Sequence, residues 1–117
     1  MAFRFESLEI WHRARAYSAH IYEITGLLPR HEDYGLESQL NRAVNSISLN
    51  IAEGSGRGTN RAFDAHLDIA IGSAFEVISG LALALDQQYI DAAIHRRLYE
   101  EGEILAKSIN AFRKTLR

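Results

Sequence analysis

Apolar residues recur three or four positions apart through nearly the whole chain, which is the spacing of one face of an amphipathic α-helix. The pattern predicts four helices, over about residues 9–28, 36–55, 60–85 and 91–116. No segment shows the strict alternation of a half-buried strand. Short connections between helices of this length force neighbours to run antiparallel. We therefore predict an all-α fold in which residues 1–117 form one antiparallel up-down-up-down four-helix bundle.

The residues between the predicted helices are of the types that end or begin helices. Pro29, the only proline, follows the first helix. Glycines are frequent from Gly54 to Gly58, where they favour a helix end. This run lacks the spacing of a phosphate-binding loop and follows a helix, so a turn is favoured over a nucleotide site. Thr59 with Asn60, and Asp91, are suitable N-caps for the last two helices.

The second helix has three faces. Its core series is Leu36, Leu40, Ala43, Val44, Ile47, Ile51 and Gly54. Beside it runs a second series at helical spacing, which we call the polar seam: Gln39, Arg42, Ser46, Asn50, Glu53 and Arg57. The third face carries Asn41, Asn45 and Ser48 and is expected to lie in water. Two interpretations of the polar seam stay open, namely a solvated flank and a partly buried contact with another helix or subunit.

The third helix also has a second face. Its core series is Phe63, Leu67, Ala70, Ala74, Ile78, Leu81 and Leu85, and beside it lie Ala62, Ile69, Gly72, Ser73, Glu76, Gly80 and Leu83. A helical glycine costs about 1 kcal/mol relative to alanine, so Gly72 and Gly80 predict a close contact with a helix or subunit. Glu76 would need a partner if buried. Arg42 and Asn50 are the candidates, from the same chain or a neighbour.

The first helix carries two adjacent apolar stripes, which predict two packing partners. The core stripe is Ile10, Ala14, Tyr17, Ile21, Ile24 and Leu28, and the other is Leu8, Trp11, Arg15, Ser18 and Tyr22. For Trp11 and Tyr22, a widened core and a contact between subunits are equally favoured. These doubled faces predict a homo-oligomer with contact residues Trp11, Arg15, Gln39, Arg42, Ser46, Asn50, Glu53, Arg57, Ser73 and Glu76.

The composition of the chain bears on its cellular compartment and on its possible partners. The chain has no cysteine, which excludes disulfides and thiolate chemistry and fits a reducing compartment. Its start lacks the apolar run of a signal peptide, and no stretch approaches the ~20 apolar residues of a membrane span. We therefore expect a soluble cytoplasmic protein. The net charge of -2 does not indicate nucleic-acid binding by the whole chain, so RNA would need a local patch.

The best candidates for an RNA contact are basic residues near the turn after the second helix and at the chain end: Arg57, Arg61, Arg113, Lys114 and Arg117. Arginine makes up eleven of the thirteen basic residues and suits bidentate phosphate contacts. For the basic residues at the chain end, the alternative is a favourable interaction with the helix dipole.

No residue set is a credible catalytic or metal centre. Glu9 and His12 have the Glu-x-x-His spacing of di-iron bundles, but no second such pair exists and both point away from the apolar series. The five histidines are scattered. The only polar set that could do acid–base chemistry is Arg42, Ser46, Asn50 and Glu53, which spacing alone does not separate from a structural network. We expect no enzymatic activity, cofactor, metal or small-molecule substrate.

A family resemblance rests on residues around the second helix. They are Tyr34-Gly35-Leu36, Gln39-Leu40, Arg42-Ala43, Ser46-Ile47, Asn50-Ile51-Ala52-Glu53-Gly54 and Arg57, with Phe3, Leu8 and Trp11 before them and Phe63, Leu67, Ala70, Gly72-Ser73 and Glu76 after them. On these residues the chain resembles the 23S rRNA intervening-sequence protein family. Ser48 stands where that family often has proline, which puts in question the helix kink that the proline implies.

The resemblance implies a small cytoplasmic four-helix bundle that assembles as a ring of five and has no established activity. Members are similar to proteins encoded within inserts of bacterial large-subunit rRNA genes, and distantly to the accessory protein of diversity-generating retroelements. Three functional hypotheses follow. The favoured one is a non-catalytic homo-oligomeric interaction or scaffold module. The alternatives are an RNA-binding accessory protein that acts through arginine-rich patches of the oligomer and, remotely, an enzyme.

Overall fold

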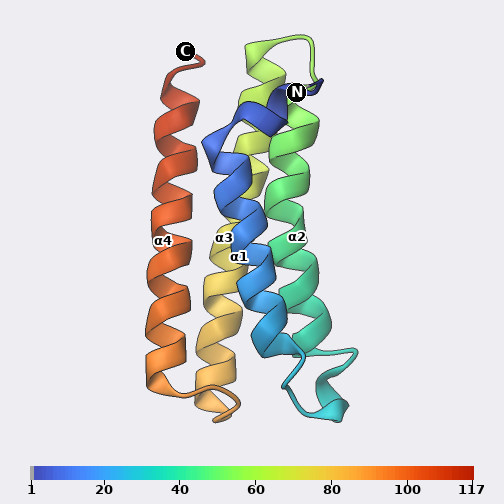
Figure 1. The fold of residues 1–117 in the computed structure, drawn as a ribbon, viewed down its shortest axis with the longest axis vertical. Helices are drawn as coiled ribbons and strands as arrows, with labels where there is room; N and C mark the ends of the chain where they lie inside the picture. Colours follow the sequence, from blue (N-terminus) through green and yellow to red (C-terminus); the bar gives the residue numbers. More distant parts are fainter. Residues whose placement is uncertain (1) are drawn as a thin grey trace.

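Four long helices account for most of the molecule. The structure, a computed structural model, describes residues 2–117 and measures 43 × 23 × 23 Å. Its α-helices are α1 (Glu9–Thr25), α2 (Leu36–Ser55), α3 (Asn60–Asp86) and α4 (Ala92–Lys114), and two short 3-10 helices are η1 (Arg4–Ser7) and η2 (Arg30–Glu32) (Figure 1). Residues 2–117 contain no strand, so the predicted all-α fold class is confirmed.

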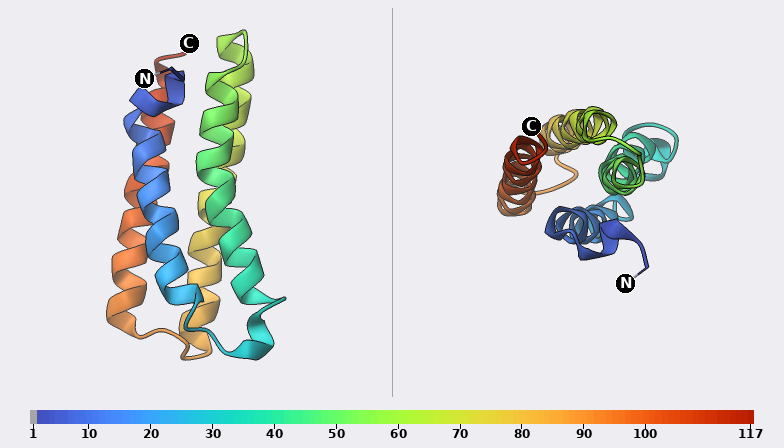
Figure 2. Two further views of the ribbon diagram at one scale, coloured as in Figure 1. Left: turned by 45° about the vertical axis from the view of Figure 1, so that its right-hand side comes forward. Right: turned by 90° about the horizontal axis from the view of Figure 1, so that it is seen from above.

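Successive helices pack side by side and run in alternating directions, which is the predicted up-down-up-down arrangement (Figure 1). Viewed along the bundle, α3 stands between α2 and α4, and α1 lies across from it (Figure 2). Helices α2 and α4 therefore occupy diagonal corners and point the same way. Both chain ends and the α2–α3 connection lie at one end of the bundle, and the other two connections lie at the opposite end.

A tyrosine is among the largest side chains of the core. Tyr17 is fully buried, and its hydroxyl donates a hydrogen bond to the carbonyl oxygen of Leu98 at 3.0 Å. Burial, and then the negative charge of Glu101, raise the pKa of the Tyr17 hydroxyl. A Cβ at Gly102 would lie 2.5 Å from the Tyr17 hydroxyl. The glycine therefore leaves room for the tyrosine and lets α4 approach α1 closely.

Two helix ends differ from the prediction. Helix α1 ends at Thr25 rather than residue 28, and Gly26 is its C-cap. Leu28, which the apolar pattern assigns to the helix, is buried from within the turn that follows. Helix α4 begins after Asp91, whose carboxylate accepts the Ile94 N–H at 2.8 Å, and ends at residue 114 rather than 116. Apolar spacing marks buried positions, and a turn beyond a helix end can bury a residue as well.

Two of the three side chains on the third face of α2 bond to α1, whereas the prediction places this face in water. The hydroxyl of Thr25 donates to the side-chain oxygen of Asn41 at 2.7 Å, and the amide of Asn45 donates to the hydroxyl of Tyr22 at 2.6 Å. The hydroxyl of Ser18 donates to a backbone carbonyl of α2 at 3.3 Å. Ser18 and Tyr22 of the second stripe of α1 therefore contact α2 within the subunit, while the Tyr22 ring stays 46% exposed.

Helix α3 is turned slightly from the predicted orientation. Val77 and Ala84 are buried, whereas Ile78 and Leu85 are only partly buried. By length and composition α3 could cross a membrane, a test that core helices of soluble proteins also pass; its apolar 18-residue window is 39% buried. This differs from the prediction that no stretch of the chain is apolar enough to span a membrane, because Glu76 is the only charged residue between Ile69 and Leu85. Much of an apolar helix thus faces outward.

Candidate interaction surface on helices α2 and α3

The polar seam joins a chain of hydrogen bonds that runs along the boundary between α2 and α3. The Ser73 hydroxyl donates to the Ser46 hydroxyl at 2.8 Å, and the Asn50 amide donates to the same oxygen at 3.0 Å. The chain continues from Asn50 to His66, whose Nδ1 lies 3.0 Å from the Asn50 side-chain oxygen. The Nε2 atom of His66 lies 3.3 Å from a carboxylate oxygen of Glu53.

His66 belongs to this network, although the sequence analysis did not include it in the polar seam or its partners. Its side chain is 16% exposed and lies between an amide oxygen and a carboxylate, so a protonated imidazole could donate to both. His66, Ser73 and Gly80 recur every seven residues along α3, and all three face α2. This seven-residue spacing was the sequence signal that could have placed His66 beside Ser73.

The exposed end of the polar seam carries an ion pair. Arg57 donates to Glu53 at 2.7 Å, one helical turn apart. This hydrogen bond, followed by the charge of His66, holds the pKa of the Glu53 carboxyl below its usual range. Glu53 is therefore an ionised partner in a network and not a proton donor near neutral pH. Within residues 2–117, no buried side-chain nitrogen or oxygen lacks a hydrogen-bond partner.

The expected partners of Glu76 are not found within the chain. The amide of Asn50 bonds to Ser46 and its oxygen to His66, and no ion pair joins Arg42 to Glu76 among the described residues. Arg42 and Glu76 are both exposed. Gln39 and Glu76 border a small groove of about 120 Å³ between the two helices.

The two glycines of the α3 second face behave differently. A Cβ at Gly80 would lie 2.6 Å from the Cδ2 atom of Leu40, so this glycine allows the close approach of α2. A Cβ at Gly72 would meet nothing within 4 Å. The predicted close contact therefore exists within the subunit at Gly80, whereas at Gly72 the face is open.

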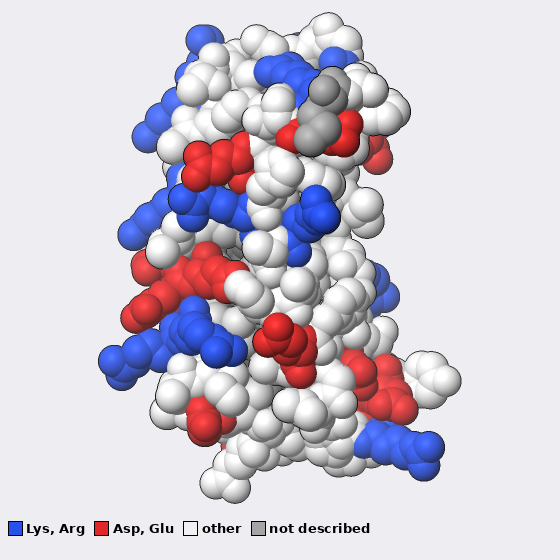
Figure 3. Space-filling view, viewed as in Figure 1, with Lys and Arg blue, Asp and Glu red and all other residues white. Residues whose placement is uncertain are grey.

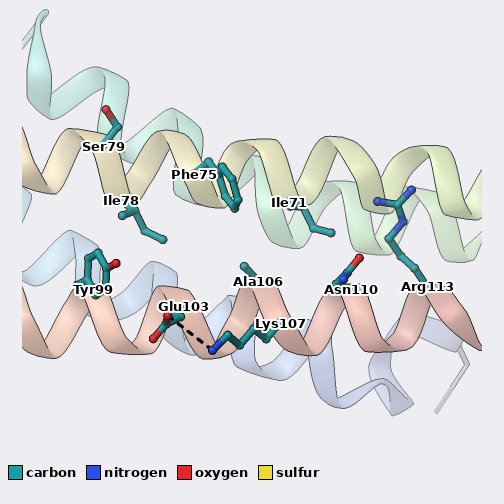
Figure 4. A pocket seen from close by; sticks show the side chains of 10 residues that line it. All are labelled: Ile71, Phe75, Ile78, Ser79, Tyr99, Glu103, Ala106, Lys107, Asn110 and Arg113. Carbon is teal, nitrogen blue, oxygen red and sulfur yellow. Dashed lines mark ion pairs between the residues drawn. The ribbon is translucent and has the colours of Figure 1, made fainter.

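Large apolar side chains are exposed along the same helix. Ile69 is 53% exposed, Phe75 64% and Leu83 52%. A groove of about 680 Å³ runs between α3 and α4, and Phe75 is one of its lining residues. Figure 4 shows Ile71 and Ile78 pointing from α3 towards α4, and the ion pair between Glu103 and Lys107, 3.6 Å long, on the α4 side.

Trp11 and Arg15, which the prediction includes in the contact surface, are held by contacts within the chain. The Trp11 ring lies 4.8 Å from the ring of Phe5, and the Arg15 guanidinium stands 5.3 Å from the Trp11 ring. On the same end of the bundle, the Arg4 guanidinium stands 5.0 Å from the ring of Phe63. The segment before α1 therefore packs against one end of the bundle.

Two of the five candidate RNA contacts are engaged in ion pairs. Arg113 is 16% exposed and bridges Asp64 at 2.8 Å and Asp68 at 3.0 Å. The Arg113 hydrogen bond lowers the pKa of the Asp64 carboxyl, and the aspartates raise the pKa of Arg113. Arg57 is paired as described above, whereas Arg61, Lys114 and Arg117 are exposed. On the face drawn in Figure 3, both signs of charge are interspersed.

The Glu9 and His12 side chains do not converge on one point. Glu9 pairs with Arg13 at 2.9 Å, and the Nε2 atom of His12 lies 2.7 Å from the backbone oxygen of Glu6. Residues 2–117 hold no group of three His, Asp or Glu side chains placed to bind a metal ion.

These features define a small antiparallel four-helix bundle with a continuous polar network and a partly uncovered apolar helix. The fold is similar to the crystal structure of a protein of unknown function from the S23 ribosomal protein family of Bacteroides thetaiotaomicron VPI-5482, with a TM-score of 0.83. The alignment covers 90% of this chain and 98% of that chain at 20% sequence identity, which supports the fold alone. A search of curated proteins finds no significant match.

The sequence also matches a family model. The model described as 23S rRNA-intervening sequence protein covers residues 6–111. The chain therefore belongs to the 23S rRNA-intervening sequence protein family, as the Asn50 to Gly54 segment suggests.

Proposed function

We propose that the protein is a non-catalytic self-assembling interaction module, and that the ring of five implied by the family resemblance is its assembled form. The observation that carries this proposal is the poor coverage of α3, whose apolar window is only 39% buried in one subunit. Covering the exposed half of a large apolar side chain contributes roughly 1 kcal/mol. Ile69, Phe75 and Leu83 together therefore favour association by a few kcal/mol.

Two further features of the same face support a second copy as the partner. Gly72 lies in a helix interior, where it costs about 1 kcal/mol relative to alanine, and no contact within the described chain offsets this. Arg42 and Glu76 leave one unpaired charge of each sign on this face. A surface with both charges and small residues suits contact between identical chains.

The non-catalytic part of the proposal rests on the hydrogen bonds of the polar seam. The Asn50 amide donates to Ser46, and His66 joins Asn50 to Glu53, so these side chains bond to one another along the α2–α3 boundary. Arg42, the fourth member of the only candidate catalytic set, makes no contact with Glu53 in the described part of the chain. This arrangement, which aligns two helices, supports a structural role for the polar seam.

Sedimentation velocity and native mass spectrometry on the intact chain, from nanomolar to micromolar concentrations, test the assembly. We expect an oligomer that dissociates on dilution. Leu83→Ser and Ile69→Ser should raise the concentration at which subunits separate and should leave the melting temperature of the separated subunit unchanged. Leu27→Ser, at an exposed position in the turn after α1, is the control. A monomer at all these concentrations would refute the proposal.

RNA binding is a second candidate, favoured by the position of the exposed basic residues. Arg61 lies in the first turn of α3, and Lys114 at the end of α4 and Arg117 at the chain end lie at the same end of the bundle (Figure 1). A ring would repeat this patch and could gain avidity. Filter binding to structured RNA should show an affinity that falls as salt increases, and Arg61→Ala with Lys114→Ala should weaken it. An RNA affinity that changes neither with salt nor in these variants would rule out this mode of RNA binding.

A further inference from the structure

Helices α2 and α4 each carry one stripe of mostly exposed residues, and the two stripes have the same spacing. Each stripe steps four, three and four residues along its helix: Arg42, Ser46, Leu49 and Glu53 on α2, and Glu103, Lys107, Asn110 and Lys114 on α4. Lys107 and Asn110 line the α3–α4 groove together with Glu103. Because the steps agree, the two stripes can be compared residue by residue in height along the bundle.

The first residues of the two stripes lie at one height. Ser46 touches Ser73 on α3, so Arg42, one turn away on the antiparallel helix, is level with Val77. On the other side of α3, Ile78 lies against Gly102 of α4, with 3.1 Å between the Ile78 side chain and a Cβ built there. Glu103, the next residue, is therefore level with Val77 as well.

The last residues of the two stripes also share a height. Glu53 lies against His66 on α3. Arg113 on α4 bridges Asp64 and Asp68, which flank His66 in the sequence. The two stripes, on diagonal corners of the bundle, therefore run in register over about three helical turns, and Lys114, next to Arg113, falls at the height of Glu53.

The charges at matching heights are opposite. Arg42 is level with Glu103, and Glu53 is level with Lys114. Between the two charged levels, Leu49 is 66% exposed on the α2 stripe. The α3–α4 groove offers apolar surface to such a side chain, with Ile71 at about the height of Leu49 and the exposed ring of Phe75 about one turn away (Figure 4). The α2 stripe and the groove are thus complementary in charge and in polarity.

Rotation about an axis parallel to the bundle preserves height, and α2 and α4 point the same way. A second copy related by such a rotation could therefore place its α2 stripe against the α3–α4 groove of the first with the matching charges opposite each other. The two surfaces lie at different corners of the bundle, with α3 between them (Figure 2). Contacts between different surfaces of identical chains form a closed ring when the rotation closes.

We propose that the α2 stripe of each subunit docks into the α3–α4 groove of the next subunit, with Arg42 paired to Glu103 and Glu53 to Lys114 across the contact. The proposal rests on the self-assembly proposed above and identifies its two surfaces. Helix α3 then lies on the inner side of the ring, where its uncovered apolar and small residues face the other copies.

Charge reversal on the intact chain tests this pairing. Arg42→Glu and Glu103→Arg each place like charges opposite each other and should raise the subunit dissociation constant about tenfold or more. The double variant restores an opposite pair and should recover wild-type dissociation within about threefold. Arg96→Glu, at an exposed α4 position outside both surfaces, is the matched control. Melting of each variant, followed by circular dichroism, checks that the subunit fold is kept.

Phe75→Ser provides a second variant that does not depend on charge. The Phe75 ring is largely exposed in the subunit, so the change should weaken assembly at least fivefold and leave the subunit folded. The pairing would be overturned if neither single charge reversal changed the dissociation constant, or if the double variant dissociated as readily as the single variants. Either result would leave self-assembly itself intact. A wild-type protein that never associates would overturn self-assembly itself.

Discussion

Replacing Gly54 by alanine should destabilise the subunit because α2 and α3 leave no room for a methyl group there. A Cβ at Gly54 would lie 2.7 Å from the Cβ of His66, 2.8 Å from a ring carbon of Phe63 and 3.3 Å from the Phe63 carbonyl oxygen. The first and last of these atoms belong to, or are bonded directly to, the α3 backbone. The methyl group therefore displaces the helix and not a flexible side chain.

The size of the effect follows from two opposing contributions. Ordinary van der Waals contact begins near 3.4 Å, so the helices would have to separate locally by roughly 0.7 Å, and overpacking of this kind costs about 1 to 3 kcal/mol. Alanine has a better helix propensity than glycine by about 1 kcal/mol at most, and less near a helix end. We therefore expect a net loss of about 1 to 2 kcal/mol in the free energy of unfolding.

Urea unfolding followed by circular dichroism measures this loss, at protein concentrations where the midpoint no longer depends on concentration. The matched control is Gly72→Ala, since a Cβ at this helical glycine meets open space and should stabilise the subunit by about 1 kcal/mol. Opposite signs at the two positions would support the packing argument. A Gly54→Ala variant as stable as the wild type would refute it.

Three further changes test the core and the ion pairs. Ile47→Ala should cost about 2 to 5 kcal/mol in urea unfolding, since Ile47 is fully buried, and a smaller loss would show that the core collapses around the cavity. Arg113→Ala should lower the melting temperature at neutral pH, because the Asp64 carboxylate that Arg113 pairs with is then ionised. The difference should begin to shrink as the pH falls below about 3.8, the ordinary aspartate value, and should be lost as the pH falls through the depressed pKa of Asp64 in the folded protein. A difference that does not change with pH would refute the ion pair. The Glu32 carboxylate accepts hydrogen bonds from the Leu36 N–H at 3.0 Å and the Tyr89 hydroxyl at 2.9 Å, and both bonds lower its pKa. Glu32→Gln should therefore destabilise the fold at neutral pH and lose this effect in acid, where the carboxyl is protonated. Equal melting temperatures at pH 7 would argue against both bonds.

The local features of the fold could be predicted from the order of the residues. Hydrogen bonding within a helix and its 3.6-residue period depend on near neighbours only, so the apolar spacing was enough to place four helices and to assign Ile47 and Leu67 to the core. The cap at Asp91 could be predicted for the same reason. The family resemblance around Asn50 was also local, and the match over residues 6–111 agrees with it.

What a helix faces depends on its rotation and height relative to its neighbours, and no local pattern encodes these. The packing of α1 decided that Asn41 bonds to another helix and does not lie in water. The packing of α3 decided that His66 completes the polar seam and that Arg113 binds aspartates 45 and 49 positions away in the chain. Such contacts arise only once the whole bundle has formed, because they join residues whose distance in space is set by packing and not by sequence separation.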